Sequence, residues 1–151
     1  MNSIQLENLL LLDNEIKKNY IGIYPIDDMN ELKQNNNLMI VNLDPSYKPG
    51  SHWVVLYRKD QDTVEYFDSL GNKPNQSIVK HLFNQNFTCI YSTKRIQNYN
   101  TNTCGLYCLF YSYYCCRSCT LQNIVNCFTN DLNKNETIVL QFAYIYLKSY
   151  L

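Results

Sequence analysis

The hydrophobic and polar residues of this chain form two kinds of repeat, which predict strands in the middle and helices towards both ends. Apolar residues of segment 3–18 fall mostly on one side of a helix, and Ser3 can cap that helix. The run 38–43 is apolar almost throughout, whereas 52–58 and 63–67 are rich in β-branched and aromatic residues and have turn residues between them. The remainder of the chain returns to a mostly helical pattern.

This arrangement predicts an α+β fold in which a central mixed or antiparallel β-sheet is flanked by helices. Strands are expected at 20–24, 38–43, 52–58, 63–67 and 87–92. Helices are expected at 3–18, 27–34, 77–84, 104–117 and 120–128, followed by a last helix that Asn133 or Asn135 caps and that ends near Leu147. A chain of 151 residues without an internal repeat or a linker is expected to form a single domain, 1–151.

The composition limits the classes of protein to consider. Because 13 Lys and Arg balance 13 Asp and Glu, the chain has no general reason to bind nucleic acid, although Lys17-Lys18 and Lys94-Arg95 are small basic clusters. No apolar run approaches the ~18 residues of a membrane span, and no basic start precedes Leu9–Leu12 as it would in a signal peptide. We therefore expect a monomer that is neither secreted nor held in a membrane. Its seven cysteines are then expected to be reduced thiols.

Four residues with suitable chemistry lie at the ends of predicted elements. His52 begins one strand of a predicted hairpin and Asp68 follows the other, so antiparallel pairing brings the two together. Cys104 lies where a polar loop becomes a helix, and backbone N–H groups at a helix start lower the pKa of a thiol. Gln97 lies seven residues earlier, so the loop could return its amide to Cys104. Together they supply the base, acid, nucleophile and oxyanion donor of a cysteine-nucleophile acyl-transfer site.

Each of these residues also has a simpler interpretation when it is taken alone. A lone His on a strand is more often structural, an Asp before Ser-Leu-Gly is typical of a turn, a Cys is often a small core residue, and a lone Gln is usually on the surface. Asn98 is the alternative to Gln97, and Ser69 has no second His placed to activate it. Trp53 should point to the opposite face of the strand from His52, into the core or as a lid over the site. The joint occurrence of all four residue types at suitable junctions favours catalysis.

Three motifs carry a resemblance to a known family. They are Gly50-Ser51-His52-Trp53, Tyr66-Phe67-Asp68-Ser69-Leu70-Gly71, and Gln97 followed by Thr103-Cys104-Gly105-Leu106-Tyr107-Cys108. The set resembles adenain, the adenovirus maturation protease, and its order is similar to that of the Ulp/SENP-type SUMO proteases. The spacing of seven between Gln97 and Cys104, with segments 20–24 and 39–43, looks closer to the viral branch. The resemblance covers roughly residues 1–116 and matches the last helices only in character.

The resemblance implies a role for each residue of the set. Cys104 would be the nucleophile, His52 the general base, and Gln97 with the Cys104 amide the oxyanion hole. Asp68 would be the orienting acid; adenain has Glu at this position, whereas the Ulp type has Asp. The family also implies that no cofactor is required, although adenain is stimulated by DNA and by a short peptide that can join a Cys. Cys89 lies near the corresponding position and is the candidate contact for such a peptide, while the neutral charge argues against activation by DNA.

The resemblance further implies a substrate and a source. It implies an endopeptidase that processes capsid precursor proteins by cutting near small residues such as Gly. The source would be a DNA virus, a virophage or a Polinton/Maverick-like element. The endopeptidase would act in the virion and in the cytoplasm or nucleus of the infected cell. A protease that removes SUMO or a ubiquitin-like protein is the alternative, because it uses the same residues. A peptide-binding module without activity is the third, and the complete set of four groups argues against it.

The remaining cysteines raise the question of a metal. Cys104, Cys108, Cys115 and Cys119 repeat at helical spacing, which is typical of buried thiols behind a nucleophile. Cys116 and Cys119 form a CxxC pair, but a zinc site needs two further ligands and only Cys127 lies downstream. We therefore expect no metal site.

Overall fold

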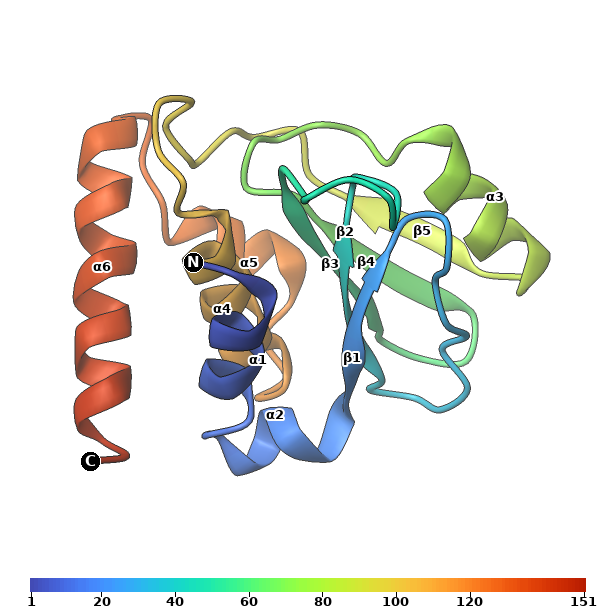
Figure 1. Cartoon of the computed structure of the whole chain (residues 1–151), viewed down its shortest axis with the longest axis horizontal. Coiled ribbons are helices and arrows are strands. Elements are labelled where there is room, and N and C mark those ends of the chain that lie inside the picture. Colours follow the sequence, from blue (N-terminus) through green and yellow to red (C-terminus); the bar gives the residue numbers. More distant parts are fainter.

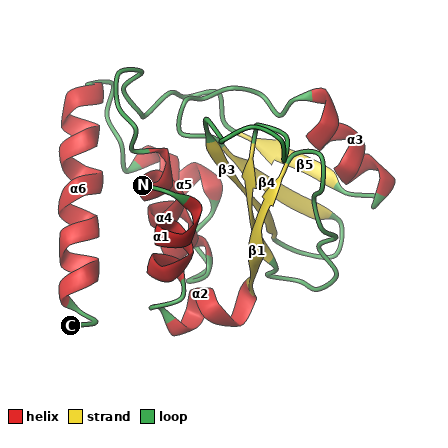
Figure 2. Cartoon of the chain, in the orientation of Figure 1, coloured by secondary structure: helices red, strands yellow, loops and turns green.

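The computed structural model describes residues 1–151 and contains one mixed sheet with strand order β1-β2-β3-β4-β5 (Figures 1 and 2). The two outer pairs, β1 with β2 and β4 with β5, are parallel, and the inner pairs are antiparallel. The strands are β1 Tyr20–Pro25, β2 Leu38–Asn42, β3 Trp53–Arg58, β4 Thr63–Phe67 and β5 Thr88–Tyr91. The helices are α1 Ser3–Leu10, α2 Asn14–Asn19, α3 Gln76–Asn84, α4 Cys104–Cys115, α5 Leu121–Asn126 and α6 Leu132–Lys148. The predicted α+β fold with a mixed sheet is confirmed.

The sheet separates two hydrophobic cores because alternate residues of a strand point to opposite faces. Val55 of β3 belongs to the larger core, which the sheet shares with α1, α4, α5 and α6. Its neighbours Val54 and Leu56 belong to the smaller core, which α3 covers with Ile78 and Leu82. Figure 1 shows this arrangement, with α3 on one side of the sheet and the other helices on the opposite side. Helix α4 lies between the sheet and α6, so nine of its 12 residues are buried.

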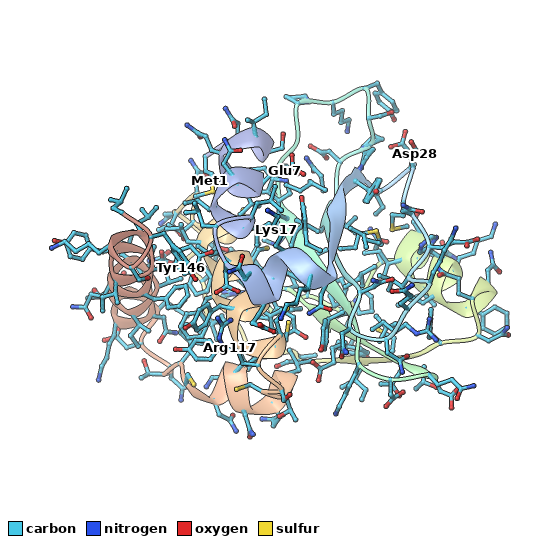
Figure 3. The ribbon with its side chains drawn as sticks, turned by 90° about the horizontal axis from the view of Figure 1, so that it is seen from below. Met1, Glu7, Lys17, Asp28, Arg117 and Tyr146 are labelled. Atoms are coloured by element: carbon cyan, nitrogen blue, oxygen red, sulfur yellow. The ribbon has the colours of Figure 1, made fainter.

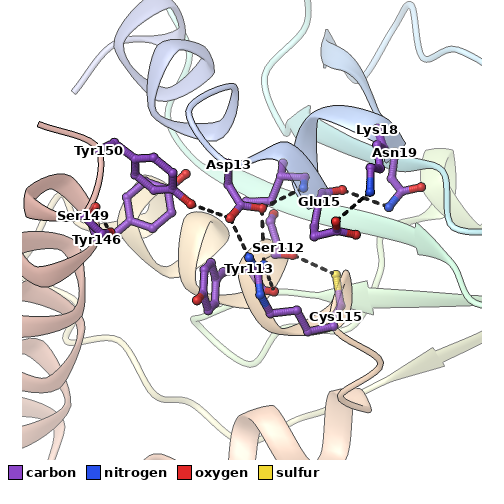
Figure 4. Close-up of polar contacts among 12 residues, drawn as sticks. Asp13, Glu15, Lys18, Asn19, Ser112, Tyr113, Cys115, Tyr146, Ser149 and Tyr150 are labelled. Carbon is purple, nitrogen blue, oxygen red and sulfur yellow. Dashed lines mark hydrogen bonds and ion pairs between the residues drawn. The ribbon is translucent and has the colours of Figure 1, made fainter.

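The first predicted helix is divided into α1 and α2, which corrects the expectation of one helix over 3–18. Asn2 caps α1 in place of Ser3, because its side chain accepts the N–H of Gln5. Asp13 breaks the helix by capping α2 and by accepting a hydrogen bond at 2.6 Å from Arg117. It accepts another at 2.6 Å from the hydroxyl of Tyr150 (Figure 4). A buried carboxylate with these partners requires a sharp turn at residue 13.

Two further expectations about helices are wrong. Segment 27–34 is irregular, because its polar groups bond to distant parts of the chain: Arg58 donates to the carbonyl of Leu32 at 2.9 Å, and Gln85 accepts the N–H of Leu32 at 3.1 Å. The last helix is capped by Asp131, because this carboxylate accepts two N–H groups of the first turn. Asn135, one of the two predicted caps, is instead fully buried inside the helix.

Helix α6 is the outermost helix and packs on α4 through aromatic side chains. Phe142 of α6 meets Phe110 of α4 edge to face, with ring centroids 4.9 Å apart. Tyr146 points from α6 towards α1 (Figure 3), and its hydroxyl donates to the carbonyl of Leu9 at 2.7 Å. These contacts fix the position of α6 relative to α4 and α1. No helix of the protein combines the length and the apolar character that crossing a membrane requires.

Candidate active site

A cleft of about 430 Å³ opens at the end of the sheet where β3 begins and β4 ends. The loops that meet there lie along the upper edge of the molecule in Figure 2. His52, Gln97 and Cys104, which are three of the four predicted site residues, line this cleft together. The other lining residues are Met1, Gly50, Ser51, Trp53, Leu70, Tyr99, Thr101 and Asn102. The fourth predicted residue, Asp68, lies behind His52.

The β3–β4 hairpin brings His52 and Asp68 together. In its antiparallel register Val55 pairs with Phe67, so the residue before β3 and the residue after β4 lie at the same end. Nε2 of His52 lies 2.6 Å from Oδ1 of Asp68. The His52 side chain is 12% exposed and that of Asp68 is fully buried, so water competes little for this contact.

The turn after β4 fixes the carboxylate of Asp68. The same Oδ1 atom accepts the N–H of Leu70 at 2.9 Å, which is the local bond of an Asx turn. Gly71 completes the turn with a φ of +71°, and a Cβ at that position would lie 2.7 Å from the backbone nitrogen of Arg95. The turn interpretation of Asp68 and its contact with His52 are therefore compatible, since the turn aims the carboxylate at the ring.

Cys104 is the first residue of α4, and its thiol lies beside His52. Burial raises the pKa of the Cys104 thiol, but interactions with the His52 ring and with the backbone of Trp53 and Gly105 outweigh this effect and bring the pKa below its ordinary value. Burial in turn lowers the pKa of His52, but Asp68 and the Cys104 thiol raise it to about 9. These opposite shifts favour a thiolate paired with a protonated imidazole near neutral pH.

The side-chain amide of Gln97 is held at both ends. Its Nε2 donates to the backbone carbonyl of Thr101 at 3.1 Å, and its Oε1 accepts the hydroxyl of Ser69 at 2.6 Å. Because a carbonyl can only accept, the contact with Thr101 identifies the nitrogen end of the amide. Nε2 also lies 3.4 Å from the hydroxyl of Thr101, which is a long contact. Because Gln97 is buried and lines the cleft, this amide can present an N–H to a group bound beside Cys104.

The first turn of α4 supplies further donors. No oxygen atom of the protein accepts the N–H groups of Cys104 and Gly105, because these groups precede the first helical hydrogen bonds. The N-cap residue Thr103 makes no side-chain bond to the helix either. Unpaired N–H groups at a helix start stabilise negative charge, such as a thiolate or an oxyanion.

Trp53 forms a wall of the cleft. It is half-buried, packs against the larger core and also lies over Gly105. A Cβ at Gly105 would lie 3.3 Å from the Trp53 ring and 2.9 Å from Sδ of Met1. The cleft is therefore narrow on this side of the nucleophile, and the interpretation of Trp53 as a lid agrees with its position.

The structure leaves other candidate residues outside the cleft. Cys89 lies on the edge strand β5, where burial raises the pKa of its thiol to about 11. Asn98 points away, since its side chain donates to Asn133 at 2.9 Å. Cys108 and Cys115 are buried behind the nucleophile, and burial raises the pKa of both thiols well above the ordinary value. No three His, Cys, Asp or Glu side chains gather in a metal-binding arrangement.

Sequence reasoning missed residues that hold the site without carrying out chemistry. Ser69 was considered only as a nucleophile, yet it orients Gln97. Thr101 accepts from the Gln97 amide, and Glu136 of α6 binds the loop that contains Thr101. Ser69 lies in the motif that contains Asp68, whereas Thr101 and Glu136 belong to no recognisable motif. Glu136 lies 32 positions after Cys104, so only the packing of α6 on α4 brings it near.

Comparison with known proteins gives one related sequence and several similar folds. No family model matches the chain. The cysteine protease S273R of African swine fever virus is 33% identical over 84 residues, which represent 48% of this chain and 31% of that protein. The chain thus matches less than a third of the length of this relative. The crystal structure of the same virus's pS273R protease is 23% identical, with a TM-score of 0.46 over 68% of this chain and 43% of the other.

Two solved structures share the fold over nearly the whole chain. The Chlamydia trachomatis effector protein Cdu1, solved bound to ubiquitin, has a TM-score of 0.59 at 14% identity and covers 99% of this chain and 81% of its own. The central domain of Lpg1148 from Legionella pneumophila has a TM-score of 0.57 at 13% identity and covers 98% and 99%. The chain is therefore similar in sequence to part of a viral cysteine protease, and it shares its fold with Cdu1 and the Lpg1148 domain.

Proposed function

We propose that this chain is a cysteine endopeptidase in which Cys104 is the nucleophile, His52 the general base and Asp68 the residue that orients His52. The observation that carries this proposal is the His52–Asp68 pair at 2.6 Å beside a thiol of lowered pKa at the start of α4. The relationship to a viral cysteine protease supports the same class of reaction. The free N–H of Cys104 and the amide of Gln97 would form the oxyanion hole.

In this reaction His52 takes the proton of the Cys104 thiol, and the sulfur attacks the carbonyl carbon of the scissile peptide bond. The carbonyl π electrons move to the oxygen, where the N–H groups of Cys104 and Gln97 stabilise the negative charge. The oxyanion then collapses, the C–N bond breaks, and protonated His52 gives its proton to the leaving amine. A water molecule, deprotonated by His52, hydrolyses the thioester and restores the thiolate and protonated His52.

For the substrate we propose viral capsid precursor proteins, cut near small residues such as Gly. The viral origin of the related protease supports a viral substrate. The narrow side of the cleft, where Trp53 and Met1 approach Gly105, supports a preference for residues without large side chains. The chain would then act in the virion and in the cytoplasm or nucleus of the infected cell, as a monomer.

Removal of a ubiquitin-like protein is a second candidate function. The observation in its favour is the shared fold with Cdu1, which was solved bound to ubiquitin. Both functions would use the same four residues and a narrow cleft. They differ in what lies around the cleaved bond, which is a flexible precursor segment in one case and the tail of a folded modifier in the other.

For an activator we propose a peptide that contacts Cys89, in preference to DNA. Cys89 lies on β5, whose outer edge has no partner strand and could bind an extended peptide. The formal charge of zero argues against DNA. A Cys-containing peptide should raise the rate of hydrolysis and form an adduct that the Cys89→Ser variant lacks. An equal rise in rate in that variant would contradict the contact.

The test of the proposed function compares the wild-type chain with the Cys104→Ala variant on two sets of substrates. Candidate capsid precursors are one set, and ubiquitin and SUMO fused to a C-terminal reporter are the other. We expect new N-termini next to small residues in the precursors, produced by the wild type alone. Cleavage of only the modifier fusions would identify the second function. Binding without cleavage by both chains would identify a module without activity and contradict the proposal.

A further inference from the structure

A single carboxylate of α6 binds the loop that joins Gln97 to Cys104. Oε1 of Glu136 accepts the backbone N–H of Asn98 at 2.9 Å and lies 3.1 Å from the hydroxyl of Thr101, which also lies 2.8 Å from the carbonyl of Asn98. Oε2 accepts the hydroxyl of Thr103 at 2.7 Å. The hydroxyl of Tyr107, one turn into α4, lies 3.2 Å from Oε1. The carboxylate thus contacts the loop at its beginning, middle and end, and contacts the helix that follows it.

The environment of Glu136 suits a charged acceptor. The residue is only 9% exposed, and its neighbours are one backbone N–H and three hydroxyls. The N–H of Asn98 and the hydroxyl of Thr103 donate to it, whereas the hydroxyls of Thr101 and Tyr107 share their protons with backbone carbonyls. An ionised carboxylate only accepts, and its two oxygens can take about four hydrogen bonds in total. A buried charge is stable only when it has such partners, so this carboxylate and the loop determine each other's conformation.

Two contacts connect Glu136 to the oxyanion donors. Thr101, whose carbonyl accepts from the Gln97 amide, is itself bound to Glu136 through its hydroxyl. Thr103 is the N-cap of α4, and an N-cap hydroxyl normally accepts an N–H of the first helical turn. Here that hydroxyl is turned towards Glu136 instead, and the N–H of Gly105 stays free of protein oxygens.

We propose that Glu136 is a positioning residue for the oxyanion hole, a role that rests on the proposed function. It fixes the amide of Gln97 through Thr101, and it keeps the capping hydroxyl of Thr103 away from the N–H groups at the start of α4. Glu136 does not line the cleft, so it acts only through these neighbours.

The test uses Glu136→Ala and Glu136→Gln in the full chain, with Glu15→Ala and Glu15→Gln as matched controls. The side chain of Glu15 is 45% exposed, and its carboxylate pairs with Lys18 alone. The readouts are kcat and KM on a cleaved precursor peptide, the alkylation rate of Cys104 by iodoacetamide, and the side-chain amide resonance of Gln97, assigned through its loss in Gln97→Ala.

For Glu136→Ala we expect kcat to fall about 10- to 100-fold, below the limit of about 10³ for complete loss of one oxyanion donor, while KM changes less than about threefold. The alkylation rate should stay within about twofold, because the thiolate and His52 are untouched, and the Gln97 resonance should shift. Glu136→Gln should recover most of kcat, since its oxygen can face the donors of Asn98 and Thr101 while its nitrogen donates to Thr103. The Glu15 variants should match the wild type.

An unchanged kcat in Glu136→Ala, or a fall in alkylation proportional to the fall in kcat, would overturn the positioning role. If Glu136→Ala does not fold, Glu136→Met, which keeps the volume and removes both acceptor oxygens, carries the test, and a kcat and a Gln97 resonance identical to those of the wild type would overturn it. If the wild type cleaves none of the substrates, the proposed function is wrong, but the positioning role of Glu136 can still be tested. The Gln97 resonance of the variants then decides alone whether Glu136 fixes the amide.

Discussion

Nε2 of His52 contacts Oδ1 of Asp68 at 2.6 Å, which leaves Nδ1 as the ring nitrogen that serves the thiol of Cys104. An ionised carboxylate can only accept, so Nε2 must carry a proton and Nδ1 is the basic nitrogen. The second oxygen of Asp68, Oδ2, is buried and has no partner. Asp68 therefore fixes the tautomer of His52 through one oxygen, and its charge stabilises the protonated ring.

The Asp68→Asn variant tests this relationship. An asparagine that keeps Oδ1 in place can still accept from both His52 and Leu70, but it no longer supplies the charge that raises the pKa of His52. We expect kcat to fall by about 10²-fold or more, within the roughly 10⁴ loss known for such a change in a catalytic triad, and the alkaline limit of activity to move to lower pH. A pH profile identical to that of the wild type would mean that another group orients His52.

The pH dependence of the wild type follows from the two opposite shifts. Hydrolysis requires thiolate and protonated His52 together, so it should rise through the lowered pKa of Cys104 and fall as His52 loses its proton near pH 9. Alkylation requires only the thiolate, so its rate should not decline at alkaline pH. Parallel measurements of both rates from pH 4 to about 10 separate the two groups. An alkaline fall in both rates would contradict the assignment of that limb to His52.

Replacement of Gln97 by alanine removes one oxyanion donor and leaves the nucleophile in place. We expect kcat to fall by about 10²- to 10³-fold with little change in KM, because the oxyanion forms only during the reaction. The iodoacetamide rate of Cys104 should be nearly unchanged. A control is Asn98→Ala, whose side chain points towards Asn133 and away from the cleft, and which should retain most of the activity. Equal losses in both variants would indicate a general disturbance of the loop.

Gly105→Ala tests the narrow side of the cleft. The new Cβ would lie 2.9 Å from Sδ of Met1, which is flexible, and 3.3 Å from the Trp53 ring. We expect the free energy of unfolding to change by less than about 1 kcal/mol, because alanine is the better helix former. The specificity constant kcat/KM should fall by about tenfold for a peptide with Gly before the cut, since the methyl group occupies space that the substrate needs. An unchanged kcat/KM would mean that the substrate does not occupy the space beside Gly105.

Much of this fold could be predicted from local patterns. The β3–β4 hairpin could be predicted because its strands are rich in β-branched and aromatic residues and a short polar turn joins them, and antiparallel pairing places the start of one strand beside the end of the other. That pairing alone brings His52 and Asp68 to one end of the sheet. The errors lie where tertiary hydrogen bonds override local preference, as at Asp13, which breaks the first helix to bind Arg117 and Tyr150.

The supporting residues of the site could not be predicted in the same way. Ser69 and Thr101 hold Gln97 through contacts between separate loops, and Glu136 reaches the same loop from a helix near the C-terminus. Such contacts depend on how α6 packs on α4, and residue spacing carries no information about that packing. Chemistry-bearing residues at element junctions were visible in the sequence, whereas the groups that hold them became visible only in three dimensions.

The most direct test of the nucleophile is the rate at which each thiol reacts with iodoacetamide at neutral pH, followed by peptide mass spectrometry. Cys104 should react at least about tenfold faster than the other six thiols, because its thiolate is stabilised by His52 and by the start of α4. Cys116 is the strictest comparison for the reactivity of Cys104, because the pKa of the Cys116 thiol is also lowered, chiefly by its contact with Cys115. In the His52→Ala variant the alkylation rate of Cys104 should fall, while the rates of the other six thiols should stay unchanged. Equal labelling of Cys104 and the other thiols in the wild type would contradict its role as the nucleophile.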